Sequence, residues 1–114
     1  MSLLADLISS LDSLQVSIET GVFSDTPPDE YIVITPMSDR FDLFADNKAQ
    51  TVIEEARLSI FTKYNYQTLK NRVTKHLLNQ DIIITDRQYI GYENDTKYHH
   101  YAIDVMKENE MEEY

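Results

Sequence analysis

The sequence contains no cysteine, which excludes disulfides, thiolate zinc sites and cysteine nucleophiles and suits a reducing cytoplasm. Only two glycines and three prolines are present, so long flexible linkers are not expected. Neither glycine belongs to a phosphate-binding loop, and no serine lies in a Gly-x-Ser-x-Gly elbow. No run approaches the about 18 consecutive apolar residues of a membrane-spanning helix, so we expect no membrane partner.

Cations are also scarce. Ten lysines and arginines stand against twenty aspartates and glutamates, which gives a net charge of −10. A protein that binds duplex DNA gains affinity by neutralising phosphates with lysine and arginine. We therefore expect this chain to repel DNA, unless its few cations are gathered on one face.

The length of 114 residues fits one domain with one core, and 42% hydrophobic residues is ordinary for a globular protein. We expect a single domain over residues 1–108 and an acidic, frayed tail over residues 109–114. The segment 1–14, MSLLADLISSLDSL, lacks the basic region of a signal peptide and reads as an amphipathic helix.

Apolar residues at helical spacing predict two helices. The first covers residues 2–13, and the second lies within residues 65–80 with Asn65 as its N-cap. The apolar stripe of the first consists of Leu4, Leu7, Ile8 and Leu11, and that of the second of Tyr66, Leu69, Val73, His76 and Leu77.

Strand signals occupy most of the remainder. Residues 31–36, YIVITP, read as a strand, and residues 50–63 fit either a helix or a strand, with strand favoured in the second half. Between them, residues 37–49 look like a long loop or the tip of a long hairpin. Residues 81–92 and 97–107 predict a β-hairpin closed by the polar residues 93–96.

This order predicts an α+β, two-layer domain. It has an antiparallel or mixed sheet, two helices packed on one face, and a long loop between the central strands. The residues expected to be largely buried are Leu4, Leu7, Ile8, Leu11, Ile32, Ile34, Leu58, Ile60, Leu69, Val73, Leu77, Ile103 and Val105.

The stretch YENDTKYHHYAID, residues 92–104, is the richest in chemical groups. Strand alternation places His99 and His100 on opposite faces, so they cannot chelate one metal together. A metal site would need His100 with Asp104, or with Asp86 or Gln88 on the paired strand. We predict instead that His100 and Asp104 point outward, with no metal site and no cofactor. The inward side chains are expected to be Tyr101, Ile103 and Val105, with His99 at the edge of the core.

Other charged groups fit solvated or interface positions. Adjacent Glu54 and Glu55 should lie on opposite faces of a strand. Lys70, Arg72 and Lys75 lie on or near the solvent side of the second helix, where they are either solvated or paired with the acidic surface of a neighbouring copy.

Five phrases in order carry a resemblance to a known group. They are YIVITP, SDRFDLFADN, EARLSIF, YIGYE and YHHYAIDV, within residues 19–108. In their order and spacing they resemble small tail-completion proteins of siphophages and prophages of Gram-positive bacteria, in the wider tail-terminator and tail-to-head joining group. None of the phrases is a catalytic signature.

The resemblance implies a structural role and not an enzyme. Such proteins are α+β domains that assemble into a ring, usually a hexamer, which closes the head-proximal end of the tail tube and faces the head connector. The implied partners are further copies of the chain, the tail tube protein and a head-completion or connector protein, with phage DNA passing through the lumen without specific binding. The implied location is the virion, at the head–tail interface, and the host cytoplasm during assembly.

The resemblance also implies that the extended loop over residues 37–47 is an assembly element. Phe41, Leu43 and Phe44 put apolar side chains into a segment that a small domain does not cover. The residues expected to mediate interactions are Asp39, Arg40, Phe41, Leu43, Phe44, Asp46, Arg57, Lys70, Arg72 and Lys75.

Two other classes stay open. One is an adaptor or regulatory module that binds a single partner as a monomer or dimer. The other is a small metal-dependent hydrolase that uses His99 or His100 with Asp86 and Asp104.

Overall fold

The computed structural model describes residues 3–20, 28–43, 49–80 and 82–110, with the backbone alone at 39–43, 49–51 and 109–110. Its elements in chain order are α1 (Leu3–Leu11), a 3-10 turn (Asp12–Leu14), β1 (Ser17–Thr20), β2 (Glu30–Leu43), β3 (Ala49–Thr62), α2 (Tyr66–Leu78), β4 (Ile83–Tyr92) and β5 (His99–Glu110).

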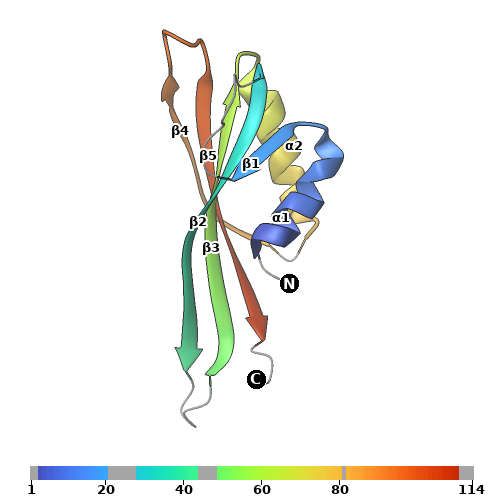
Figure 1. Cartoon of the computed structure of the whole chain (residues 1–114), viewed down its shortest axis with the longest axis vertical. Helices are drawn as coiled ribbons and strands as arrows, with labels where there is room; N and C mark the ends of the chain where they lie inside the picture. Colours follow the sequence, from blue (N-terminus) through green and yellow to red (C-terminus); the bar gives the residue numbers. More distant parts are fainter. Residues whose placement is uncertain (1–2, 21–27, 44–48, 81, 111–114) are drawn as a thin grey trace.

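The strands form one mixed sheet in the order β1-β2-β3-β5-β4. β1 pairs with β2 in parallel, and the other neighbours are antiparallel. Both helices lie on the same side of this sheet (Figure 1). The predicted α+β, two-layer architecture is confirmed, and the sheet is of the mixed kind. Among the described helices, none is long and apolar enough to cross a membrane.

Helix α1 buries a stripe of leucines spaced four residues apart. Leu3, Leu7 and Leu11 are at most 2% exposed, whereas Ile8 is 41% exposed. The prediction that Ile8 belongs to the core is wrong, and Leu4, also predicted to be largely buried, is only partly buried at the edge of the core. Residues at i and i+4 share a helix face, and the stripe that begins at Leu3 turns Ile8 about 100° away from the sheet.

Helix α2 begins as predicted, and three residues of its predicted apolar stripe are buried, whereas Tyr66 and His76 are only half-buried. The Asn65 side chain accepts a hydrogen bond from the Gln67 backbone N–H at 3.0 Å, which caps the first turn. Leu69, Val73 and Leu77 are at most 1% exposed and face the sheet.

The ambiguous segment at residues 50–63 is strand up to Thr62, the last residue of β3, so the helical alternative is wrong. Ala56, Leu58 and Ile60 alternate into the core, and buried Thr62 donates its hydroxyl to the Glu30 carboxylate at 2.8 Å. The buried core cluster is Leu3, Leu7, Leu11, Ile32, Ile34, Ala56, Leu58, Ile60, Leu69, Val73, Leu77, Ile82, Tyr101, Ile103 and Val105.

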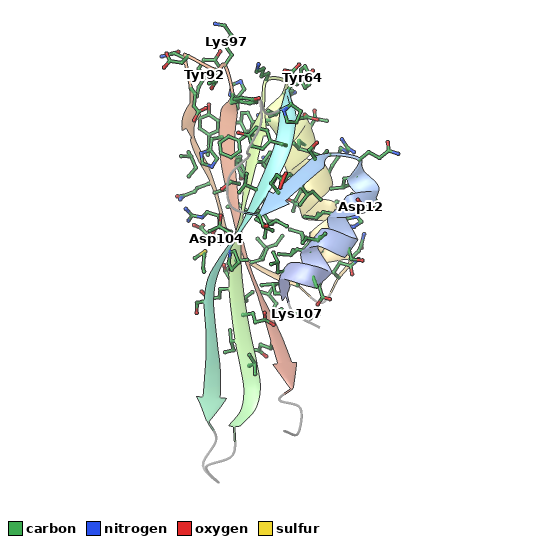
Figure 2. The ribbon with its side chains drawn as sticks, viewed as in Figure 1. Asp12, Tyr64, Tyr92, Lys97, Asp104 and Lys107 are labelled. Atoms are coloured by element: carbon green, nitrogen blue, oxygen red, sulfur yellow. The ribbon has the colours of Figure 1, made fainter. Side chains whose placement is uncertain are left out.

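The predicted hairpin of β4 and β5 is confirmed. The Glu93 N–H donates to the Tyr98 carbonyl at 2.8 Å, and the Lys97 N–H donates to the Glu93 carbonyl at 2.7 Å. Lys97 has a φ of 66°, a left-handed conformation that reverses the chain. Figure 2 shows this turn, with Tyr92 and Lys97, at the end of the molecule that also carries Tyr64.

The opposite end of the sheet extends past the helices and gives the molecule its length of 54 Å against widths of 26 and 24 Å. Residues 40–43, 49–53 and 108–110 of β2, β3 and β5 form this extension (Figure 1), which we call the arm. Among the arm side chains that the structure describes, Ile53 is buried but does not belong to the core cluster. Strand β5 continues through Glu110, two residues past the predicted end of the domain.

Candidate interaction surfaces

The loop that the sequence predicted at residues 37–47 is strand where the structure describes it. Residues 37–43 belong to β2, so the long-loop interpretation is wrong for them, and their pairing with β3 fits the hairpin interpretation. Residues 44–47 lie outside the described residues. The register pairs Arg40 with Ile53 and Phe41 with Val52. The sequence looks irregular here because no layer packs on this part of the sheet, so neither face needs a regular apolar alternation.

Of the interaction residues predicted in this region, Asp39, Arg40, Phe41 and Leu43 lie in β2, where the structure describes the backbone. Phe44 and Asp46 lie outside the described residues.

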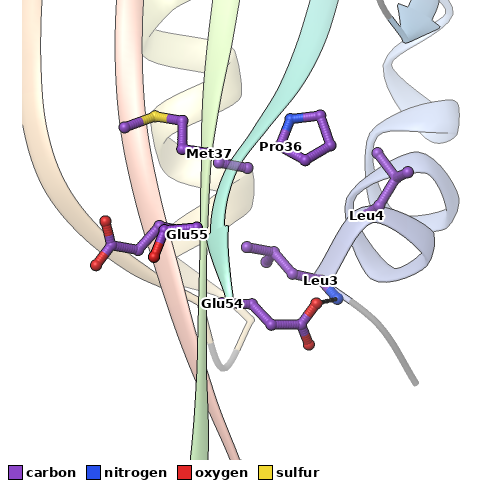
Figure 3. Close-up of a pocket in the computed structure, with 8 residues that line it drawn as sticks. Leu3, Leu4, Pro36, Met37, Glu54 and Glu55 are labelled. Atoms are coloured by element: carbon purple, nitrogen blue, oxygen red, sulfur yellow. Dashed lines mark hydrogen bonds between the residues drawn. The ribbon is translucent and has the colours of Figure 1, made fainter. Parts of the chain in front are cut away.

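A hollow of about 290 Å³ lies at the base of the arm, where α1 meets β2 and β3. A bulge between Pro36 and Ser38 shifts the β2–β3 register at this point. Glu54 accepts a hydrogen bond from the Leu3 backbone N–H at 3.1 Å and so holds the start of α1 over the hollow (Figure 3). Figure 3 also shows Glu54 and Glu55 on opposite sides of β3, as alternation predicted.

Arg57 forms a bidentate ion pair on the sheet face opposite the helices. Its Nε and Nη2 atoms donate to the Asp104 carboxylate at 2.7 and 3.1 Å. Asp86 is paired with Asp104 on the neighbouring strand. The hydrogen bond and negative charge of Asp104, with a smaller effect of Asp86, raise the pKa of the Arg57 guanidinium. Arg57 is therefore occupied within its own chain.

The other three predicted cations are on α2, on the far side of the core from Arg57. Lys75 is exposed, Arg72 donates to the Leu14 carbonyl at 2.8 Å, and the Lys70 ammonium lies 5.4 Å from the centre of the Tyr101 ring. The structure therefore groups Lys70, Arg72 and Lys75 and separates them from Arg57.

The two histidines point to opposite faces, as predicted. His99 lies on the helix side among tyrosines, and its Nδ1 is 3.0 Å from the Tyr89 hydroxyl oxygen. His100 lies on the other side and stacks on Phe61, with 4.2 Å between ring centres. Tyr101, Ile103 and Val105 are buried in the core, which confirms the predicted inward set.

The groups required by the hydrolase alternative are not brought together. Asp104 is bound to Arg57, and His99 is on the other face of the sheet. Within the described part of the chain, no three His, Asp or Glu side chains are grouped closely enough to hold a metal ion. The local pattern is that of a hairpin with an aromatic surface.

His100 supplies a test of pH-dependent stability. Its ring is half-buried, and its Nε2 atom is buried without a hydrogen-bond partner. Burial lowers the pKa of His100 below the ordinary value of 6.5. The negative charge of Glu93 opposes this shift, and the positive charge of Arg57 adds to it. As the pH falls below about 6.5, His100 therefore becomes protonated in the unfolded chain before it does in the folded chain. The free energy of unfolding decreases over this range, until the pH has passed the lower pKa of His100 in the folded state.

We predict that His100→Phe, which keeps a ring against Phe61, lowers the dependence of stability on pH. Thermal melts of both proteins at pH 7.5 and pH 5.0 measure this pH dependence. The drop in melting temperature on acidification should be smaller for His100→Phe than for the wild type. An equal or larger drop in the variant would show that His100 does not carry this dependence.

Comparisons with known proteins give a fold likeness and no sequence relative. No model of a protein family matches the sequence, and no curated protein matches it. A chain of the solved structure described as the virion of native gene transfer agent (GTA) particle has a similar fold, with a TM-score of 0.62 and 11% sequence identity over 96% of each chain. The likeness therefore concerns the whole architecture of the domain.

Proposed function

We propose that this protein is a non-enzymatic structural component of a phage particle. In this proposal it forms a homo-oligomeric ring, most simply a hexamer, at the head-proximal end of the tail tube. The ring terminates the tail and joins it to the head connector. Its partners are further copies of itself, the tail tube protein and a connector protein.

The arm is the observation that carries the proposal. A three-stranded extension that no helix covers gains little stability in an isolated domain, because the strands have no second layer of secondary structure against which to pack (Figure 1). A surface of this kind becomes useful when another chain covers it. The fold likeness to a virion chain over 96% of both chains supports the same conclusion.

The charge of the chain sets a physical constraint on such a ring. Six copies would carry 6 × −10 = −60 charges. This acidity suits a channel through which DNA passes without sticking. It also opposes assembly, although salt screens the repulsion beyond about 8 Å at physiological ionic strength. The ring must therefore contain specific contacts between oppositely charged or apolar surfaces.

Deletion of the gene from its phage or prophage tests the proposal. Electron micrographs of the lysate should show filled heads separated from tails, because unterminated tails cannot join. Supplying the wild-type gene from a plasmid should restore complete particles, which controls for effects on neighbouring genes. Normal infectious virions from the deletion strain would contradict the proposal.

A further inference from the structure

Half of the cations in this acidic chain are gathered on and around one helix. Residues 63–87 contain five of the ten lysines and arginines but only two of the twenty carboxylates. Within them, α2 carries three cations and no carboxylate, which is a local charge of +3. Although the chain as a whole is acidic, α2 is therefore a basic segment, with Lys70, Arg72 and Lys75 as its cations.

The outward direction of α2 is set by its buried residues. Leu69, Val73 and Leu77 face the sheet. Lys75 is two positions from both Val73 and Leu77, about 200° around the helix, and so points away from the sheet. Arg72 is exposed toward the α1 side, where it reaches the Leu14 carbonyl. Lys75 and Arg72 are thus the cations of α2 best placed to meet another molecule.

The complementary charge lies at the arm end of the chain. Residues 108–114, ENEMEEY, contain four glutamates and no cation, a charge of −4. The strand that leads into this segment, β5, reaches Glu110 at the far end of the arm (Figure 1). The basic helix α2 and the described start of the acidic segment, residues 108–110, therefore occupy different parts of the molecule.

The acidic segment 108–114 is poorly placed to reach the outward face of α2 in its own chain. The four residues after Glu110 span at most about 14 Å when fully extended. They would have to run back along the arm and also pass over a helix about 10–12 Å thick to reach the outward face of α2. A second copy placed head-to-tail meets no such limit.

Building on the proposed ring, we propose that the outward face of α2 binds the acidic segment 108–114 of the neighbouring copy. Each copy then offers one basic and one acidic surface, which is the heterologous contact that closes a ring by rotation. Exposed ion pairs are individually weak. Their main effect here is to fix the orientation of neighbours whose net charges repel.

Two charge-reversal variants test this contact. Arg72→Glu/Lys75→Glu, the helix variant, changes the net charge from −10 to −10 − 4 = −14. Glu112→Lys/Glu113→Lys, the tail variant, changes it to −10 + 4 = −6. Each variant is supplied to the deletion strain, and infectious particles are counted. We expect each to reduce the titre about tenfold or more, because like charges then face each other at every contact.

Combining the reversals gives the decisive result. The chain that carries both pairs of substitutions returns to a net charge of −10 and should restore the titre. Co-expression of the helix variant with the tail variant should restore it as well, because each acidic surface then meets a basic surface on the other chain. Lys63→Glu/Lys97→Glu, also at −14, is the matched control for net charge and should leave the titre unchanged. Melting temperatures and immunoblots establish that every variant is folded and present.

Each other outcome overturns the inference in a recognisable way. If net repulsion alone governs assembly, the tail variant will support a titre at or above that of the wild type. If the contact lies within one chain, the combined variant will work but co-expression will fail. If α2 binds DNA, the helix variant alone will fail and will lose affinity for a duplex in fluorescence polarisation. A normal titre without the gene would instead contradict the proposed function itself.

Discussion

Leu77→Ala is expected to lower the free energy of unfolding by about 2–5 kcal/mol, whereas Leu78→Ala should change it by less than about 0.5 kcal/mol. The two leucines are neighbours in α2 and undergo the same chemical change. Leu77 is fully buried against the sheet, and Leu78 is 66% exposed. Truncation of Leu77 removes buried methyl groups and leaves a cavity between the layers, whereas truncation of Leu78 leaves no cavity.

Denaturant unfolding measures both effects on the same scale. A domain of this size has a total stability of about 5–15 kcal/mol, so the Leu77 variant should lose a large share of it. The slope of the unfolding free energy against denaturant concentration should stay constant if both variants unfold in two states. Equal midpoints for the wild type and the Leu77 variant would contradict the orientation assigned to α2.

Strand faces could be predicted from the sequence because alternation is a local property. The opposite orientation of His99 and His100, and the inward positions of Leu58 and Ile60, follow from position parity along one strand. The N-cap at Asn65 is likewise local, since the cap bonds a residue only two positions away.

Features that depend on which elements become neighbours could not be predicted. The sequence indicates the strands of Arg57 and Asp104 separately, but their ion pair requires β3 to lie beside β5, and the two residues are 47 positions apart along the chain. The prediction that Ile8 is buried was wrong for a similar reason. Two overlapping apolar stripes are possible on α1, and which of them is buried depends on where the sheet lies.

The arm shows the limit of pattern reading most clearly. Alternation reveals a strand only when one face is buried, and no helix covers this part of the sheet. The polar composition of residues 37–49 suggested a long loop or a hairpin tip, although polar residues are also compatible with a strand, and residues 37–43 are strand. The same irregularity that hid the strand from prediction is compatible with the interface that we propose for the arm.

Phe41→Asp/Phe44→Asp is expected to abolish particle assembly while leaving the domain folded. Phe41 lies in the arm by its backbone pairing with Val52, and neither helix covers the arm (Figure 1). Buried aromatic side chains at interfaces often contribute 2 kcal/mol or more each, so losing two of them should weaken a contact about a thousandfold. The added carboxylates also increase repulsion between acidic copies.

The matched control for this arm variant is Ile8→Asp/Ile90→Asp. Both variants replace two apolar residues by aspartate and reach a net charge of −12, but Ile8 is exposed on α1 and Ile90 on β4, 41% and 45%, away from the arm and from α2. In the deletion strain, the control should give close to the wild-type number of infectious particles, and the arm variant should give separated heads and tails. We expect melting temperatures near that of the wild type for both variants. An arm variant that is folded and fully infectious would show that Phe41 and Phe44 do not anchor a neighbour, and the arm would then need a different role.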